Sequence, residues 1–157
     1  MKKIIESKIF VLSKTNKVSV PIQICYTNDD VEITVSYNDT EFCAKGKDYL
    51  WVDAFADLQA KLPSNTQLAC CMTCRHGNMC PYGNKENQLY CTKDVKITSK
   101  DSVIELMDDK GHDSFFERAV PSIHCCDDFI YQSDDCYTYN DYLYRLQKTN
   151  WCTFGRS

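Results

Sequence analysis

Cysteine content constrains this chain more than any other feature. Eleven of its 157 residues are cysteines, and five of these gather in one short stretch as Cys70, Cys71, Cys74, Cys80 and Cys91. The first residues do not read as an export signal, because charged side chains interrupt the apolar run and no small-residue cleavage site follows. We therefore expect a cytoplasmic chain, in which thiols bind metal more readily than they form disulfides.

The remaining composition is that of an ordinary globular protein, with 43% apolar and 25% charged residues. No stretch approaches the ~18 apolar residues of a membrane span. We expect a single domain with three parts: a sheet and helix over 1–63, a cysteine-rich metal-binding part over 64–130, and an acidic, Tyr-rich C-terminal helix and tail over 131–157.

The first part shows the two-residue period of strands that bury one face. We expect strands over 2–12, 18–26 and 31–37, then a short one through Phe42 and Ala44, joined by turns as an antiparallel sheet. Pro21 has no backbone N–H, so its strand is expected at a sheet edge or a bulge.

A helix is predicted over 49–62, with Asp48 as its N-cap and Pro63 as its stop. Its apolar side chains recur at helical spacing and should pack on the sheet: Trp51, Ala54, Phe55, Leu58 and Leu62. Sheet and helix together predict the α+β class, followed by a loop-rich half that a metal staples.

Regular patterns are weaker in the rest of the chain. Residues 64–94 form a loop too long to be stable without a crosslink. We expect a short helix near 101–108 capped by Ser99, a strand within 114–126, and a last helix near 139–148.

Two thiols separated by two residues, as in Cys71 and Cys74, can both point at one ion. Cys91 follows after a 16-residue gap, which lies in the range found between the halves of four-cysteine zinc sites. The fourth ligand must come from elsewhere, and Cys126 or its neighbour Cys125 is the best candidate. A structural zinc ion takes four such ligands in a tetrahedron and would supply folding free energy to this irregular region.

The cysteine-rich part resembles a loosely defined bacterial family of uncharacterised cysteine-rich domains. The resemblance covers roughly residues 68–130 and rests on Cys71-x-x-Cys74-Arg75-x-Gly77-Asn78-x-x-Pro81-x-Gly83-Asn84, on Tyr90-Cys91, and on Cys126-Asp-Asp-Phe129. It implies zinc on Cys71, Cys74, Cys91 and Cys126, and it implies no activity. Physically, Gly77 and Gly83 allow positive φ and Pro81 fixes φ, as a tight wrap around an ion needs.

Other assignments of the same residues stay open. Extra thiols at Cys70, Cys80 and Cys125 leave the choice of ligands undecided, and His76 or His124 could replace a cysteine. Four thiolates could instead hold an iron–sulfur cluster, although the spacing differs from ferredoxin runs. Cys71 and Cys74 could also form a redox dithiol.

Charge is distributed unevenly along the chain. Residues 1–100 carry 11 acidic and 13 basic side chains, whereas residues 101–157 carry 11 acidic and 5 basic ones, and the net charge is −4. This balance disfavours nucleic-acid binding, which needs clustered Lys and Arg, and it suits a protein partner.

No catalytic motif accompanies the cysteines. There is no serine elbow, P-loop, dinucleotide fingerprint or HExxH, and the histidines are few: His76, His112 and His124. The leading hypothesis is therefore a non-enzymatic, zinc-stabilised interaction module, such as an immunity protein or a phage or bacterial inhibitor of a defence factor. The alternative is a thiol-based enzyme or redox sensor that uses cysteine thiolates or an iron–sulfur cluster.

Overall fold

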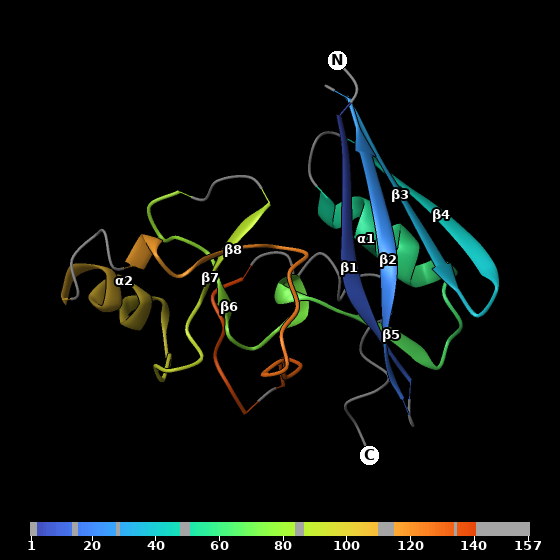
Figure 1. Ribbon diagram of the computed structural model, residues 1–157. Helices are drawn as coiled ribbons and strands as arrows, with labels where there is room; N and C mark the ends of the chain where they lie inside the picture. The colour runs from blue at the N-terminus through green and yellow to red at the C-terminus, as the bar shows by residue number, and fades with distance from the viewer. Residues whose placement is uncertain are drawn as a thin grey trace. The chain divides into compact units, whose positions relative to one another are not determined.

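The computed structural model describes residues 3–13, 16–27, 29–47, 51–83, 87–109, 115–133 and 135–140. These residues form two compact units, one ending at Ala69 and one beginning at Cys70 (Figure 1). Each unit combines a sheet and helical segments, which confirms the predicted α+β class. Among the described residues, no helix is both long enough and apolar enough to cross a membrane.

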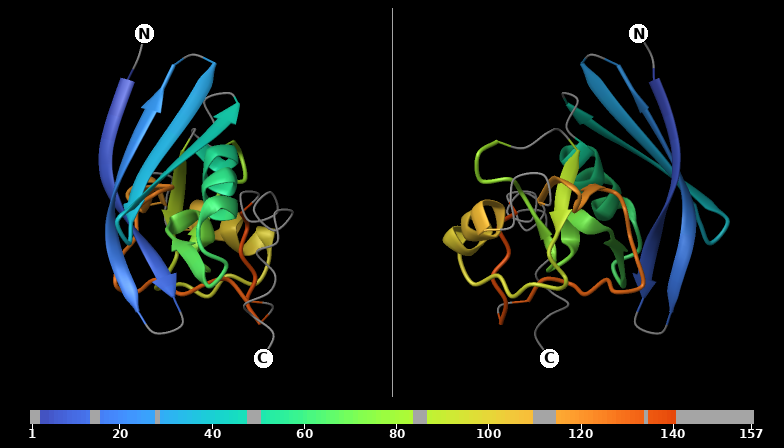
Figure 2. Two further views of the ribbon diagram at one scale, coloured as in Figure 1. Left: turned by 90° about the vertical axis from the view of Figure 1, so that its right-hand side faces the viewer. Right: turned by 60° about the vertical axis from the view of Figure 1, so that its left-hand side comes forward.

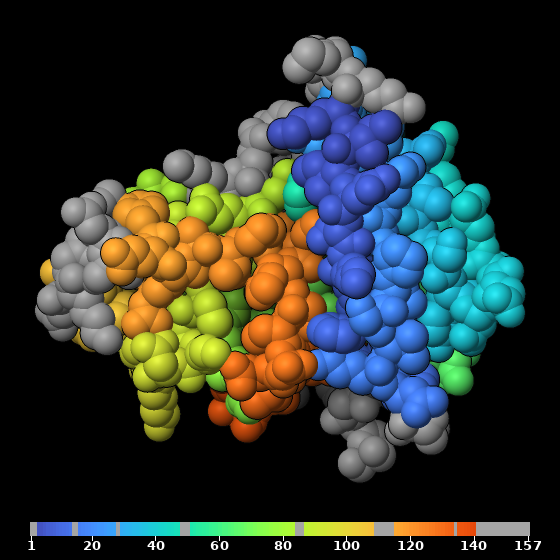
Figure 3. Space-filling model, viewed as in Figure 1, coloured from blue at the N-terminus to red at the C-terminus, as the bar shows by residue number. Residues whose placement is uncertain are grey.

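The first unit is a five-stranded antiparallel sheet in the order β4-β3-β2-β1-β5. It curves as a half-barrel around one side of α1 (Figure 2). In the space-filling view its first four strands form one continuous surface (Figure 3). The strands are β1 (Lys3–Ser13), β2 (Lys17–Tyr26), β3 (Asp30–Tyr37), β4 (Thr40–Lys47) and β5 (Thr66–Ala69).

The predicted alternation decides which face of this sheet is buried. In β2 the side chains of Val20, Ile22 and Ile24 are buried, while the residues between and before them are exposed: Ser19, Pro21 and Gln23. The turn between β3 and β4 uses Asn38 and Asp39 at positive φ of 50° and 58°, the geometry that tight hairpins require. The four predicted strands therefore exist at nearly the predicted positions.

Pro21 does not lie in an edge strand, and this prediction was wrong. Its strand, β2, lies between β1 and β3, and Pro21 is paired with Lys8 of β1 without a bulge. The ladder between β2 and β3 begins only at Ile22, opposite Val35. The missing N–H thus falls where the pairing with β3 has ended, so the sheet tolerates it.

Helix α1 (Trp51–Lys61) packs on β4 and β3. The predicted apolar stripe is confirmed, since each of its members is buried: Trp51, Ala54, Phe55, Leu58 and Leu62. The predicted N-cap, Asp48, lies outside the described residues. A Cβ on Gly46 of β4 would lie 2.6 Å from the backbone nitrogen of Ala54, so glycine there lets the helix backbone approach the sheet.

The second unit is built around a smaller antiparallel sheet in the order β6-β7-β8. Its elements are the 3₁₀ turn η1 (Cys71–Thr73), β6 (Gly77–Asn78), β7 (Gln88–Cys91), α2 (Lys100–Asp109) and β8 (Ala119–Pro121). The predicted helix cap is confirmed, because the Ser99 hydroxyl accepts the Ser102 N–H at 3.2 Å. The first two residues of the last predicted helix (139–148), Tyr139 and Asn140, are not helical, and the rest of it lies outside the described residues.

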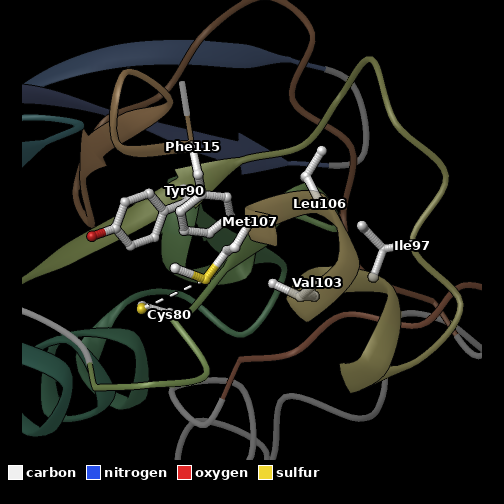
Figure 4. Close-up of a cluster of buried hydrophobic side chains, with 7 residues drawn as sticks. All are labelled: Cys80, Tyr90, Ile97, Val103, Leu106, Met107 and Phe115. Carbon is white, nitrogen blue, oxygen red and sulfur yellow. Dashed lines mark hydrogen bonds between the residues drawn. The ribbon is translucent and has the colours of Figure 1, made fainter. Parts of the chain in front are cut away.

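A separate core holds β7 and α2 together (Figure 4). Tyr90 of β7 stacks on Phe115 with ring centroids 4.5 Å apart. The buried members of this core are Cys80, Tyr90, Ile97, Val103, Leu106, Met107 and Phe115. Part of the region predicted to be irregular therefore has an apolar core of its own.

Candidate functional site

The first two candidate ligands lie on a short turn. The chain leaves η1 through hydrogen bonds from the Cys74 N–H to the Cys71 carbonyl, at 3.3 Å, and from the Gly77 N–H to the Cys74 carbonyl, at 3.1 Å. These bonds fold residues 71–77 back on themselves. The candidate ligands Cys71 and Cys74 are buried.

Gly77 serves this turn differently from the prediction. Among the described glycines only Gly83 has a positive φ, 124°, so the expectation of positive φ at Gly77 was wrong. A Cβ on Gly77 would instead lie 2.2 Å from the Cys71 carbonyl oxygen. Glycine is needed here because the backbone of β6 passes directly against the turn.

Two further segments bring the remaining candidate ligands to this turn. Gly77 pairs with Cys91 at the end of β7, which places that thiol beside the turn. The segment after β8 pairs with η1, since the Cys71 N–H donates to the His124 carbonyl at 2.7 Å and the Met72 N–H to that of Ser122 at 3.0 Å. Cys126 follows two residues after His124.

The four candidate ligands line one cavity of about 680 Å³: Cys71, Cys74, Cys91 and Cys126. His76 and His124 line it as well. Over the described part of the chain, no three or more His, Cys, Asp or Glu side chains converge closely enough to hold a metal ion as they stand. The backbone thus gathers the four thiols from three segments around one cavity, although the described side chains do not converge as closely as coordination requires.

The structure separates the members of the two adjacent cysteine pairs. Cys71 and Cys126 line the cavity, whereas Cys70 and Cys125 do not. Instead, Cys70 and Cys125 lie near the Tyr131 hydroxyl, whose pKa is raised by burial and then by both thiols.

Cys70 has a local role in the turn. Its sulfur accepts the backbone N–H of Thr73, while burial raises its pKa to about 12. The Thr73 hydroxyl in turn accepts the Cys70 N–H at 3.2 Å. Cys70 therefore caps η1 and remains a protonated thiol at neutral pH.

Cys80 belongs to the apolar core of the second unit. Its sulfur lies 4.0 Å from that of Met107 (Figure 4), and the residue is only 6% exposed. It does not line the thiol cavity. The sequence alone could not show that Cys80 has a different role from the candidate ligands, because the spacing of the cysteines is compatible with each of them as a metal ligand.

Burial is the main influence on the thiols at the turn. It raises the pKa of Cys71, and the nearby thiols of Cys70, Cys74, Cys91 and Cys126 raise it further. Burial also raises the pKa of Cys74, although the backbone N–H groups of Ile130 and His76 donate to its sulfur and oppose this. Without a cation both thiols are protonated at neutral pH, which is the opposite of an activated nucleophile.

Charged side chains that form ion pairs also line this cavity. Lys93 binds Asp128 at 2.5 Å, and Arg118 holds Asp94 through both carboxylate oxygens, one of them at 2.8 Å. Arg118 also donates to the Cys91 carbonyl at 3.2 Å, so it orients the end of β7. Sequence reasoning missed these residues because no local pattern links Asp94 to Arg118.

The surroundings of the two closely spaced thiols differ from those of a redox dithiol. In such proteins the pair lies at the N-terminus of a helix, whose dipole lowers a thiol pKa. Here η1 is three residues long, and the pKa of each thiol is raised. The arrangement favours binding of a soft cation over thiol exchange.

Comparison with known proteins gives no family for this chain. The sequence matches no known protein family, and no curated protein is significantly similar to it. The resemblance to bacterial cysteine-rich domains therefore stays a prediction from the sequence motif.

Proposed function

We propose that this chain is a non-enzymatic protein-interaction module whose second unit is stabilised by a structural zinc ion. The ligands would be Cys71, Cys74, Cys91 and Cys126. The observation that carries the proposal is their shared cavity, which unites thiols from three segments far apart in the sequence. Four thiolates are the ligand set of a closed structural zinc site.

The buried thiols support a structural ion over a reactive site. Zinc would displace protons from Cys71 and Cys74, whose pKa values burial raises, and would compensate the cost of burying their charge. Four ligands leave no open position for a substrate. Such an ion would link the turn at η1 to β7 and to the segment after β8.

A binding role fits the rest of the molecule. The chain is acidic, with a net charge of −4, and no catalytic motif accompanies the thiols. Small acidic proteins of this kind can act as stoichiometric binders, as immunity proteins and phage-encoded inhibitors of defence factors do. We place this chain in that functional class.

Metal content tests the zinc half of the proposal. The full chain is purified without oxygen, and its metals are counted by elemental mass spectrometry with a visible spectrum. We expect one zinc per chain and no colour. Iron with absorbance near ~400 nm would indicate a cluster instead and would overturn the proposal.

The adjacent cysteines provide matched controls for this measurement. Cys71→Ser and Cys126→Ser should lose most of the zinc, whereas Cys70→Ser and Cys125→Ser should keep it. Serine at position 70 can still accept the N–H of Thr73 in the turn, so that control should also fold. Equal zinc in all four variants would contradict the assignment.

The non-enzymatic half is tested by thiol reactivity. Alkylation of the zinc-loaded chain at neutral pH, followed by mass mapping, should leave the four ligands unmodified. Rapid alkylation of Cys71 or Cys74 in zinc-loaded protein would favour a thiol enzyme or redox sensor instead.

A further inference from the structure

A second cavity of about 670 Å³, a groove in the same unit, is lined by both charged and apolar side chains. Two exposed apolar side chains line it, Ile130 at 48% and Tyr137 at 38% exposure. Only three other large apolar side chains among the described residues are exposed to this degree: Ile4, Val18 and Tyr82. Two of these five exposed side chains thus line the same cavity. Apolar surface whose contact with water is unfavourable is therefore concentrated there.

Basic side chains give this groove a charge opposite to that of the chain. Arg75, Lys93 and Lys96 line it, against the carboxylates of Asp94 and Asp135. Both carboxylates are held by arginines, Asp135 by Arg75 at 3.1 Å and Asp94 by Arg118 from outside the groove.

Lys93 pairs with Asp128, which also lies outside the lining. Lys96 is exposed, and no ion pair engages it within the described ranges. The lining thus carries one net positive charge in a chain of net charge −4.

The turn that holds two candidate zinc ligands also positions this groove. The Ile130 N–H donates to the Cys74 sulfur, and the Ile130 carbonyl accepts the Arg75 N–H at 2.9 Å. The Thr138 hydroxyl, next to Tyr137, donates to the Arg75 carbonyl at 2.8 Å. The backbone of Ile130 and the side chain of Thr138, the residue after Tyr137, are therefore bonded to residues 74 and 75.

We propose that this groove binds an acidic segment of a partner protein that carries a large apolar side chain. The apolar side chain would pack between Ile130 and Tyr137, and an Asp or Glu beside it would face Lys96. Tyrosine and an apolar contact at the centre with charges at the rim are typical of protein interfaces. This inference rests on the proposed zinc-stabilised module, because the ion would hold Cys74 and, through it, Ile130.

A protein segment fits the groove better than a nucleic acid does. Phosphate backbones are bound by several cations that are available to release counterions. Here Arg75 and Lys93 already hold carboxylates, and Asp94 and Asp135 in the lining would repel phosphates. In the lining, Lys96 is the lysine that no ion pair engages among the described residues, and such a lysine near Ile130 and Tyr137 instead matches one carboxylate beside an apolar side chain.

Peptide selection on the zinc-loaded full chain tests this inference. The probe is a phage-displayed library of random dodecapeptides, and the most enriched peptide is then synthesised with fluorescein for anisotropy titration. We expect enriched peptides to combine Asp or Glu with Leu, Phe or Trp. Ile130→Ala and Lys96→Glu should each weaken binding by about tenfold or more, and salt should weaken it further.

Matched substitutions on the first unit are the controls. Ile4→Ala removes another exposed apolar side chain and Lys8→Glu reverses another exposed lysine, and both should change the affinity by less than about twofold. Absence of enrichment, selection of basic peptides, or equal binding by Ile130→Ala and the parent would overturn the inference. So would tighter binding of a fluorescein-labelled single-stranded oligonucleotide that Lys96→Glu abolishes.

Zinc content is measured on every variant used. If the chain contains zinc but the selected peptides bind Ile130→Ala and Lys96→Glu as tightly as the parent, the inference about the groove is overturned and the proposed function is not. A parent chain that contains no zinc would overturn the proposed function, whatever the peptides show.

Discussion

Substitution of Gly77 by alanine probes the turn that carries Cys71 and Cys74. The added Cβ would lie 2.2 Å from the Cys71 carbonyl oxygen, whereas ordinary contacts of a Cβ begin near 3.4 Å. That oxygen belongs to the backbone and accepts the Cys74 N–H, so it cannot rotate away. The turn and β6 must move apart by about 1 Å, and overpacking of this kind costs about 1–3 kcal/mol.

This cost should appear in zinc affinity, because the ion requires Cys71 and Cys74 to stay at one centre. At about 1.4 kcal/mol for each factor of ten, Gly77→Ala should weaken zinc binding by about 5- to 150-fold. The affinity is measured under anaerobic conditions by competition with a chromophoric chelator.

Gly46→Ala is the matched control. It creates a similar backbone clash, 2.6 Å from the Ala54 nitrogen, but in the unit that holds none of the candidate ligands. It should lower the midpoint of thermal unfolding and leave zinc affinity unchanged. Zinc binding by Gly77→Ala within about twofold of the parent, or an equal loss in Gly46→Ala, would refute this reasoning.

Three further substitutions have expected outcomes. Phe115→Ala empties a fully buried ring position in the core of the second unit and should cost about 3–5 kcal/mol in chemical denaturation; a loss below about 1 kcal/mol would contradict this packing. Asn78→Ala removes the acceptor of the Tyr139 N–H, bonded at 2.7 Å, and should lower the free energy of unfolding by about 1–3 kcal/mol. Denaturation curves that coincide with those of the parent would contradict this. Burial opposes ionisation of Asp57, but hydrogen bonds from Lys61 and a backbone N–H lower its pKa overall. The ionised carboxylate should contribute less than about 1 kcal/mol to the free energy of unfolding after solvent screening, and this contribution should be lost as the pH falls below about 4. Asp57→Asn should remove that acid dependence from the unfolding midpoint.

Apart from β5, which lies in the stretch 64–94 that was wrongly predicted to be a loop, the first unit was predictable because its determinants are local. Alternating apolar residues of period two and a stripe of helical period each specify an element and its buried face. The turn at Asn38 and Asp39 was equally legible, since both residue types tolerate positive φ. Pro21 was misassigned because its effect depends on where the neighbouring ladder ends, and register between strands is not encoded locally.

The second unit was harder to predict because its contacts join distant residues. Spacing alone selected Cys71, Cys74 and Cys91, but it could not separate Cys125 from Cys126. The structure separates them through pairing of the segment around His124 with η1, a contact across about fifty positions that no periodicity reveals. The core of Cys80 and Met107 was missed for the same reason.

Gly77 shows a related limit of sequence reasoning. Glycine in a loop indicates either positive φ or close backbone approach, and the residue type does not distinguish them. Only the position of the Cys71 carbonyl does so. The identity of the residue was informative, while its mechanism required coordinates.

X-ray absorption at the zinc edge tests the central claim most directly. The anaerobically purified full chain should show a zinc ion surrounded by four sulfur atoms at about 2.3 Å, which only four cysteine ligands can provide. A first shell containing nitrogen or oxygen would mean that His76, His124 or a carboxylate replaces one of Cys71, Cys74, Cys91 and Cys126, and a sample without zinc would contradict the account altogether.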